Sequence, residues 1–196
     1  AQAPERRPGT GFVARRETPI WQGRVISLSH GEFEGPAGTP FERDVVRHRG
    51  AVAIVAVDGD RTVTLVRQYR AALDRQVLEL PAGTCDREGE PLEVTASREL
   101  VEEVGLQPGS LRRLATIFNS PGFSDQQTTL FLATGSTSCP TARSGIEEQW
   151  MTIEHLPLDG VEERVARGEL ADSTTIVGLL LARHVLGLEA AAQPAP

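Results

Sequence analysis

Short apolar runs separated by glycine and proline are the dominant pattern of the first half of the chain. The run at 51–57 is continuous and has the length of a buried strand, and the Asp58-Gly59-Asp60 turn after it predicts a hairpin. Other runs of strand length, bounded by turn residues, are found at 12–13, 25–28, 41–48, 62–69, 78–80, 114–118, 128–133 and 151–153. We therefore expect a sheet of many short strands.

Three segments are predicted to be helical. One helix should begin near Pro91, a residue that suits a first helical turn, and end at Gly105. Two further helices are expected at about 159–168 and 173–187. Together with the strands, they predict an α/β (α+β) fold in which a mixed β-sheet is sandwiched by helices and preceded by a small N-terminal β segment.

The length of 196 residues suits one substantial domain with a small appendage. We expect an N-terminal β segment at 1–48 with its first ten residues loose, a main domain at 49–190, and a disordered tail at 191–196. Apolar residues make up 39% of the sequence, which is sufficient for a packed core.

The charge balance narrows the range of partners. Twenty basic and 27 acidic side chains give a formal charge of −7, whereas proteins that bind a nucleic-acid backbone usually carry a basic surface. Nucleic acid is therefore not expected as a partner. A polyanionic substrate would have to be met by a local cation, either a metal ion or a few placed arginines.

The cysteines and apolar segments predict a cellular location. Cys85 and Cys139 have no CxxC spacing and are expected to be free thiols in a reducing cytosol. The first residues lack the apolar region of a signal peptide, and the apolar run at 176–182 is too short to cross a bilayer. We expect a soluble cytoplasmic protein with no membrane partner.

Three glutamates form the most informative cluster of the sequence. On a helix, Glu99, Glu102 and Glu103 converge on one face because residues three and four positions apart are neighbours. The other side carries residues that can pack on the sheet, namely Val94, Leu100, Val101 and Val104. Clustered carboxylates repel one another and raise each other's pKa, and a divalent cation removes this conflict. The competing interpretation is a solvated acidic helix face.

The chemistry of the cluster favours particular metals. Carboxylate oxygens suit Mg²⁺, or Mn²⁺ as a substitute, better than zinc. The turn at 81–83 precedes the helix, and its main chain could offer the carbonyl of Ala82 to the same metal.

The stretch 83–106, GTCDREGEPLEVTASRELVEEVGL, resembles the Nudix box, G-x5-E-x7-R-E-U-x-E-E-x-G-U, where U is apolar. Gly83, Glu90 and the run at 98–106 occupy the specified positions. One departure is present, because six residues rather than five separate Gly83 from Glu90. A one-residue bulge in the loop before the helix can absorb it.

The resemblance implies a loop–helix–loop in which Glu99 and Glu103 bind metal and Glu102 joins them or positions a water. Arg98 would orient the first glutamates through charge-assisted hydrogen bonds. The bound cations would neutralise a diphosphate and help to lower the pKa of an attacking water.

Beyond the box, the chain is similar to the ADP-ribose pyrophosphatase branch over residues 12–187. The similar segments are Gln68-Tyr69-Arg70, 78–83, 119–125 and Arg167-Gly168-Glu169. The resemblance implies Mg²⁺-dependent hydrolysis of a small-molecule nucleoside diphosphate sugar, ADP-ribose, to AMP and ribose 5-phosphate. It also implies a domain-swapped homodimer in which the N-terminal β segment is exchanged and each site borrows residues from both subunits.

By position in this branch, four residues are expected to contact the substrate: Arg43, Asp44, Arg70 and Gly83. Arg70 has the stronger motif support. For Arg43 and Asp44, which lie in a variable stretch, ordinary strand-face charges are an equal alternative.

A second departure concerns the catalytic base. This branch usually carries a glutamate after the Pro-Gly-Phe stretch, and here that position is Gln126, whose amide cannot take a proton near neutral pH. Three explanations stay open. Asp125, or an acid of Glu147-Glu148, serves as the base; metal-bound hydroxide suffices; or turnover has been lost, naturally or by an engineered change.

Two alternative functions stay open. The substrate could be another nucleoside diphosphate sugar, such as GDP-mannose, because base and sugar contacts lie in variable loops. Alternatively, the chain could be a catalytically weak ADP-ribose-binding form. Gln126 favours the binding form, whereas the intact glutamate cluster argues against it.

Overall fold

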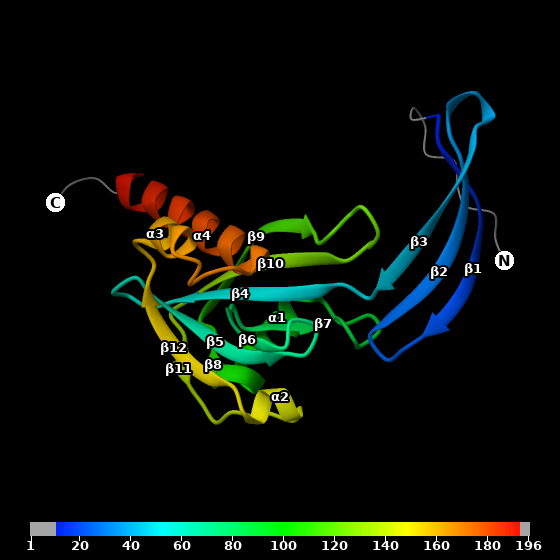
Figure 1. Cartoon of the computed structure of the whole chain (residues 1–196). Helices are drawn as coiled ribbons and strands as arrows, with labels where there is room; N and C mark the ends of the chain where they lie inside the picture. The colour runs from blue at the N-terminus through cyan, green and yellow to red at the C-terminus, as the bar shows by residue number, and fades with distance from the viewer. Residues whose placement is uncertain (1–10, 193–196) are drawn as a thin grey trace. The chain divides into compact units, whose positions relative to one another are not determined.

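The computed structural model describes residues 11–192, which form two compact units (Figure 1). One unit is the chain up to Gly50 together with Phe118–Gln127, and the other is Ala51–Ile117 together with the chain from Thr128 onward. The first ten residues and positions 193–196, for which the sequence predicted loose ends, lie outside the described residues. The last helix extends to Ala192, two residues into the expected tail.

The larger unit is built on a seven-stranded mixed sheet. Its main path has the order β12-β5-β4-β10-β9, with β6 paired to β5 and β7 to β4. The strands are β4 (Ala51–Val57), β5 (Thr62–Arg70), β6 (Arg75–Glu79), β7 (Ala82–Thr84), β9 (Ser110–Phe118), β10 (Gln127–Thr134) and β12 (Thr152–Pro157). β4 and β10 are parallel, whereas β5 is antiparallel to its neighbours. The mixed sheet predicted from the sequence is confirmed.

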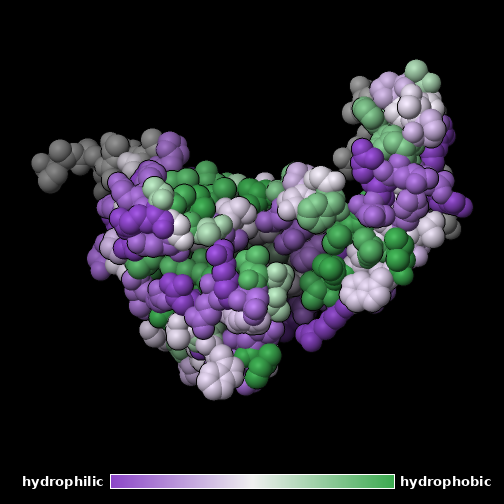
Figure 2. Space-filling view, in the orientation of Figure 1, coloured by the Kyte–Doolittle hydropathy of each residue, from purple (hydrophilic) through white to green (hydrophobic). Residues whose placement is uncertain are grey.

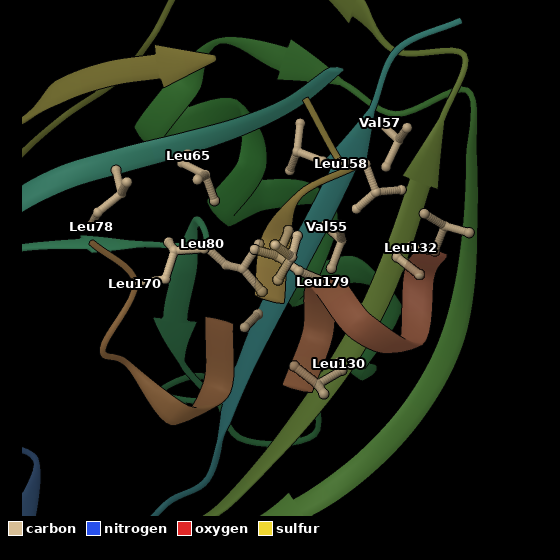
Figure 3. Packing of buried hydrophobic residues seen from close by; sticks show 14 residues of the cluster. Val55, Val57, Leu65, Leu78, Leu80, Leu130, Leu132, Leu158, Leu170 and Leu179 are labelled. Atoms are coloured by element: carbon tan, nitrogen blue, oxygen red, sulfur yellow. The ribbon is translucent and has the colours of Figure 1, made fainter. Parts of the chain in front are cut away.

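Helices cover both faces of this sheet (Figure 1). The helices of this unit are α1 (Leu92–Val104), α2 (Ile146–Gln149), α3 (Val161–Ala166) and α4 (Ser173–Ala192). α1 packs on one face, and α3 and α4 pack on the other, where they enclose the leucine-rich cluster of Figure 3. Within residues 11–192, no helix is both long and apolar enough to cross a membrane.

The continuous apolar run of β4 is explained by these two layers. Val52 and Ile54 belong to the cluster under α1, whereas Ala53 and Val55 belong to the cluster under α4. A strand covered on both faces needs apolar side chains at every position rather than at alternate ones. β4 is therefore the central strand on which both layers are built.

The smaller unit is a three-stranded antiparallel sheet with a different composition. Its strands are β1 (Val13–Gln22), β2 (Ile26–Glu34) and β3 (Pro40–His48), with a short 3-10 helix, η1 (Pro36–Gly38), between the last two. Among the described residues, none of the buried apolar side chains belongs to this unit. Ion pairs cross the sheet instead, including Arg15 with Glu34, Arg16 with Glu32, and Arg47 with Glu17.

The segment 118–127 is attached to the edge of β3. Val46 donates its N–H to the carbonyl of Phe123 over 2.8 Å. Asp125 accepts the N–H of His48 over 2.8 Å and pairs with Arg47 at 3.1 Å. These contacts explain why this distant stretch belongs to the N-terminal unit.

The structure corrects several details predicted from the sequence. β1 covers ten residues where the pattern indicated two, because its side chains are largely exposed and lack an apolar alternation. Part of the turn predicted at 81–83 pairs with β4 as β7. Val94, expected to pack on the sheet, is 51% exposed, and Thr95 and Ala96 are buried in its place. The short elements α2, β8 (Leu106–Gln107) and β11 (Thr137–Ser138) were not predicted.

Candidate metal and diphosphate site

The acidic helix α1 is fixed at both ends by local signals. Pro91 precedes it with a φ of −60°, and Gly105 ends it in the left-handed conformation at a φ of 66°. The N–H of Gly105 bonds to the carbonyls of Leu100 and Val101, which closes the last turn. Leu100 is fully buried under the sheet and contributes about 2 kcal/mol of hydrophobic stabilisation. The glutamates are therefore carried by a rigid element.

Glu103 is the most deeply buried of the three glutamates, with 4% of its surface exposed. Its carboxylate accepts the main-chain N–H of Ala82 over 3.0 Å. Burial raises its pKa to about 8, reinforced by the negative charges of Glu99 and Glu148 and opposed by the Ala82 bond. A buried carboxylate held in this way is unstable as an anion unless a cation is supplied.

Glu99 lies against the main chain at Gly83. A Cβ atom at Gly83 would be 2.0 Å from the carboxylate carbon of Glu99, so a larger residue at this position would displace the acid. Burial also raises the pKa of Glu99, an effect that Arg98 partly reverses. The glycine expected to contact substrate thus has a direct steric role beside the carboxylates.

Arg98 forms hydrogen bonds with several neighbouring glutamates through one guanidinium group. It bonds to Glu99 at 2.6 Å, to Glu102 at 3.2 Å and to Glu90 at 3.2 Å. Glu90 also accepts the hydroxyl of Thr95 over 2.8 Å. The longer loop between Gly83 and Glu90 therefore still delivers Glu90 to the arginine.

The carboxylates of the acidic cluster are engaged by neighbouring protein groups in this structure. Among residues 11–192, no three His, Cys, Asp or Glu side chains are gathered as a ready-made metal cage. Glu99 is paired with Arg98, and Glu103 is bonded to Ala82. The donors nevertheless fit a hard divalent cation, because they are all oxygens and two of the carboxylates are destabilised as anions by burial.

The model of the NUDIX domain family matches residues 47–168, which contain the acidic helix and most of the sheet. The chain belongs to the Nudix family. Nudix hydrolases generally use divalent metals, which agrees with the donor set of α1.

Curated relatives place this Nudix chain in the ADP-ribose pyrophosphatase branch. It is 40% identical to ADP-ribose pyrophosphatase of Mycobacterium tuberculosis over 89% of this chain and 83% of that protein. It is 34% identical to methanol dehydrogenase activator of Bacillus methanolicus, over 82% of this chain and 86% of the relative. A solved structure of an ADP compounds hydrolase has a TM-score of 0.77 at 21% identity, covering 94% of this chain and 98% of that one. The predicted Nudix fold is confirmed.

Arg70 lies at the end of β5, in the unit that carries the Nudix helix. Its guanidinium donates hydrogen bonds to the carboxylate of Glu79, from Nε over 3.0 Å and from a terminal nitrogen over 2.6 Å. Gln68 donates to the same carboxylate over 3.1 Å. About 45% of the Arg70 side chain is exposed, so it stays open to a ligand.

Arg43 and Asp44, expected to contact substrate, belong to the N-terminal unit, which does not contain the Nudix helix. The Arg43 guanidinium lies 5.0 Å from the ring centre of Phe41 and donates to the carbonyl of Glu42. Asp44 is 3.3 Å from the ring of His30. Both side chains are exposed, so their substrate contacts stay a prediction.

Gln126, placed by the sequence where a base was expected, also belongs to the N-terminal unit. Its N–H donates to the hydroxyl of Ser124 over 3.1 Å, and its carbonyl accepts the N–H of Asn119 over 2.9 Å. The neighbouring acid, Asp125, is engaged by Arg47 and by the His48 N–H. Its carboxylate therefore has a structural role in holding segment 118–127.

The sequence pattern did not indicate the contacts that two residues near the Nudix helix make. Glu148 accepts the N–H groups of Ser144 and Gly145, at 2.9 and 3.3 Å, and caps α2. Its negative charge raises the pKa of Glu103. Arg143 donates to the carbonyl of Glu103 over 2.8 Å. The Gly-x-x-Glu spacing could have indicated the cap, but no local signal indicated Arg143.

Proposed function

We propose that this Nudix chain hydrolyses the diphosphate of ADP-ribose to AMP and ribose 5-phosphate in a reaction that requires a divalent cation. The observation that carries the proposal is the buried Glu103 beside the partly buried Glu99 on the Nudix helix, with Gly83 packed against Glu99. Carboxylates that are removed from water and have raised pKa values destabilise a fold when they ionise, but a bound cation offsets this cost. The 40% identity to an ADP-ribose pyrophosphatase supports the substrate.

Glu99, Glu103 and the carbonyl of Ala82 are the proposed ligands, with Glu102 joining them or positioning a water. Mg²⁺, with Mn²⁺ as a substitute, would supply charge neutralisation for the diphosphate and a water of lowered pKa. Arg98 would release Glu99 to the metal and would keep Glu90 and Glu102 in place through its other bonds. Arg70, whose guanidinium is partly exposed, is the proposed contact for the substrate.

The acids of α2 are the proposed source of the general base. Gln126 cannot accept a proton near neutral pH, and Asp125 is committed to Arg47. Glu148 is near enough to the Nudix helix for its charge to raise the pKa of Glu103. This supports Glu148, whose carboxylate also caps α2, with Glu147 of the same short helix as the second candidate, and it leaves Gln126 as a hydrogen-bonding residue.

A domain-swapped homodimer is the proposed assembly. The N-terminal unit exposes the large apolar side chains of Ile20, Trp21, Val25, Ile26, Phe118 and Phe123. Figure 2 shows green, apolar surface on this unit. Exposed apolar surface of this extent on a unit that has no buried apolar side chain among its described residues favours a second copy as its cover. Exchange would let Arg43 and Asp44 serve the partner's substrate.

We also propose that the protein acts in the cytoplasm. Cys85 and Cys139 are both free, which supports a reducing compartment. A fusion that reports on thiol redox state at the protein's location would test it, and an oxidising reading would contradict it.

The first test of the activity is hydrolysis of ADP-ribose with Mg²⁺, followed by coupled phosphatase release of phosphate from the products. GDP-mannose and UDP-glucose are run beside it, together with Gln126→Glu, Glu147→Gln and Glu148→Gln. Turnover that is highest with ADP-ribose and collapses in one of the two α2 variants supports the proposal.

The other outcomes separate the alternatives. A nearly inert chain in which Gln126→Glu restores turnover identifies a binding-only form. Preference for GDP-mannose would replace the substrate but keep the reaction class. If no diphosphate sugar is cut by any variant, the proposed function is wrong.

A further inference from the structure

The C-terminal end of the Nudix helix is capped by a segment forty residues away in the sequence. The last carbonyls of a helix have no partner within it and must be satisfied from outside. Three bonds do this here: Cys139 N–H to Gly105 O at 2.8 Å, Ala142 N–H to Glu102 O at 3.0 Å, and Arg143 Nε to Glu103 O at 2.8 Å. Two of the carbonyls belong to glutamates of the acidic cluster.

Arg143 makes a second contact that leads to the base-bearing element. A terminal nitrogen of its guanidinium donates to the carbonyl of Met151 over 3.1 Å, and Met151 is buried at 3% exposure. The next two residues, Ser144 and Gly145, bind the carboxylate of Glu148. Arg143 is thus anchored at one carbonyl in the last turn of α1 and at one carbonyl just after α2.

We propose that Arg143 is a positioning residue that sets the location of the acids of α2 relative to the last turn of the Nudix helix. The inference rests on the proposed function, because it assigns the base to that helix. The simpler role, a cap that merely stabilises α1, needs the bond to Glu103 but not the second bond to Met151.

The guanidinium group suits this position for two reasons. Its fork can donate to two carbonyls that lie in different directions, which a lysine ammonium on a flexible stem does with less pre-organisation. Its positive charge also lies at the C-terminal end of α1, where no basic residue is present in the helix's own last turn. Both properties are lost in Arg143→Met, and the charge alone is kept in Arg143→Lys.

Steady-state kinetics on ADP-ribose test the proposal with Arg143→Met, Arg143→Lys and the control Arg61→Met. The Arg61 side chain is partly exposed and pairs with Asp159 at 3.5 Å, so its loss removes a surface arginine of the same unit. Because misplacement of about 1 Å can cost about 100-fold in rate, we expect kcat of Arg143→Met to fall by roughly that factor. KM should change little, and Arg143→Lys should be intermediate.

Two further readouts separate positioning from plain damage. Mn²⁺ affinity, measured by electron paramagnetic resonance, should be unchanged in both Arg143 variants because the carboxylates stay in place. Amide hydrogen exchange of residues 139–149 should accelerate in them and stay slow in Arg61→Met. If Arg143→Met does not fold, Arg143→Lys carries the comparison.

Wild-type kcat in Arg143→Lys with wild-type exchange, or a loss of kcat that tracks a loss of Mn²⁺ affinity, would overturn the proposal. A wild-type chain that is inert on every diphosphate sugar would instead refute the proposed function. The exchange measurement distinguishes the two failures, since it does not depend on turnover.

Discussion

Each of the two units of this protein is stabilised by different interactions within it. In the larger unit, the core strands β4 and β10 present fully buried residues such as Ile54, Val55 and Phe131. In the N-terminal unit, eight consecutive residues of β1 are exposed, and the strands are linked by main-chain pairing and ion pairs. Exposed ion pairs contribute about 1 kcal/mol or less each, far less than a buried leucine.

This difference indicates a division of tasks. The proposed cation site needs fixed carboxylates, and they are carried by a helix packed on the larger core. The N-terminal sheet has no comparable core and is expected to depend on a partner for its stability. Changes in the larger unit should therefore affect chemistry first, and changes in the smaller unit should affect assembly first.

The largest expected effect comes from the acidic helix. Glu103→Gln removes one proposed ligand, and loss of several kcal/mol of charge stabilisation should lower kcat about a thousandfold. The measurement is ADP-ribose hydrolysis at saturating Mg²⁺. Glu93→Gln, on an exposed position of the same helix, is the matched control and should stay close to wild type.

The same substitution should have the opposite effect on stability without metal. The pKa of Glu103 in the folded state is about 8, above its usual value of 4.5, so the folded protein is favoured while the acid is protonated. That contribution is present below pH 4.5 and is lost as pH rises through 8. In chelator, Tm of wild type should therefore fall below that of Glu103→Gln as pH rises, and added Mg²⁺ should restore wild type only. A parallel pH course in the two proteins would contradict this.

The next effect in size tests the dependence of the N-terminal unit on a partner. Trp21 is 55% exposed, and a buried aromatic at an interface contributes about 2 kcal/mol or more, so Trp21→Asp should weaken the dimer roughly 30-fold. Sedimentation velocity over a concentration series measures this. Thr18→Asp, on the same strand, is the control. A monomeric wild type would remove the proposed assembly altogether.

A smaller effect is expected from the ion pairs of the N-terminal unit. Arg47→Met breaks the pairs with Glu17 and Asp125, and because all three side chains are partly exposed the loss should be about 1 kcal/mol. High salt should lower the stability of wild type more than that of the variant. Equal salt dependence in chemical denaturation would argue against a stabilising role for this network.

The smallest effect concerns His48, at the end of β3. Burial lowers the pKa of its imidazole, partly offset by the charge of Asp125, and its Nδ1 accepts the N–H of Gly50 over 2.9 Å. The neutral ring is favoured in the folded state, so this contribution is present above pH 6.5 and is lost as pH falls through the lowered value. Tm of wild type should decline more steeply from pH 7 to 5 than Tm of His48→Asn, which keeps an acceptor.

Local and repeated signals made much of the larger unit predictable. The apolar run of β4, Pro91 before α1 and the left-handed Gly105 after it each act within a few residues. The convergence of the glutamates followed from helical spacing, and Arg98 contacts the acids that the resemblance implied. The depth of Glu103, however, depends on how the helix meets the sheet and cannot be read from spacing.

Other features depend on contacts between distant segments. β1 is defined by its pairing with β2 rather than by an alternation of apolar and polar residues, so its length could not be predicted from the sequence. Arg143 reaches the Nudix helix across forty residues of sequence, and segment 118–127 joins β3 through Asp125. The pattern of residues along the chain does not indicate contacts between segments that are distant in the sequence. It also does not decide the roles proposed for Gln126, Arg43 and Asp44.

The parallel pairing of β4 with β10 also sets the order in which the protein can form. Ala51 is aligned with Thr128, so the centre of the sheet cannot close until a long stretch of chain, including the whole Nudix helix, has been synthesised. Closing such a large loop is entropically costly and slows folding. On the ribosome, the acidic helix therefore emerges before β10, the strand whose Phe131 and Ala133 complete the apolar cluster under it.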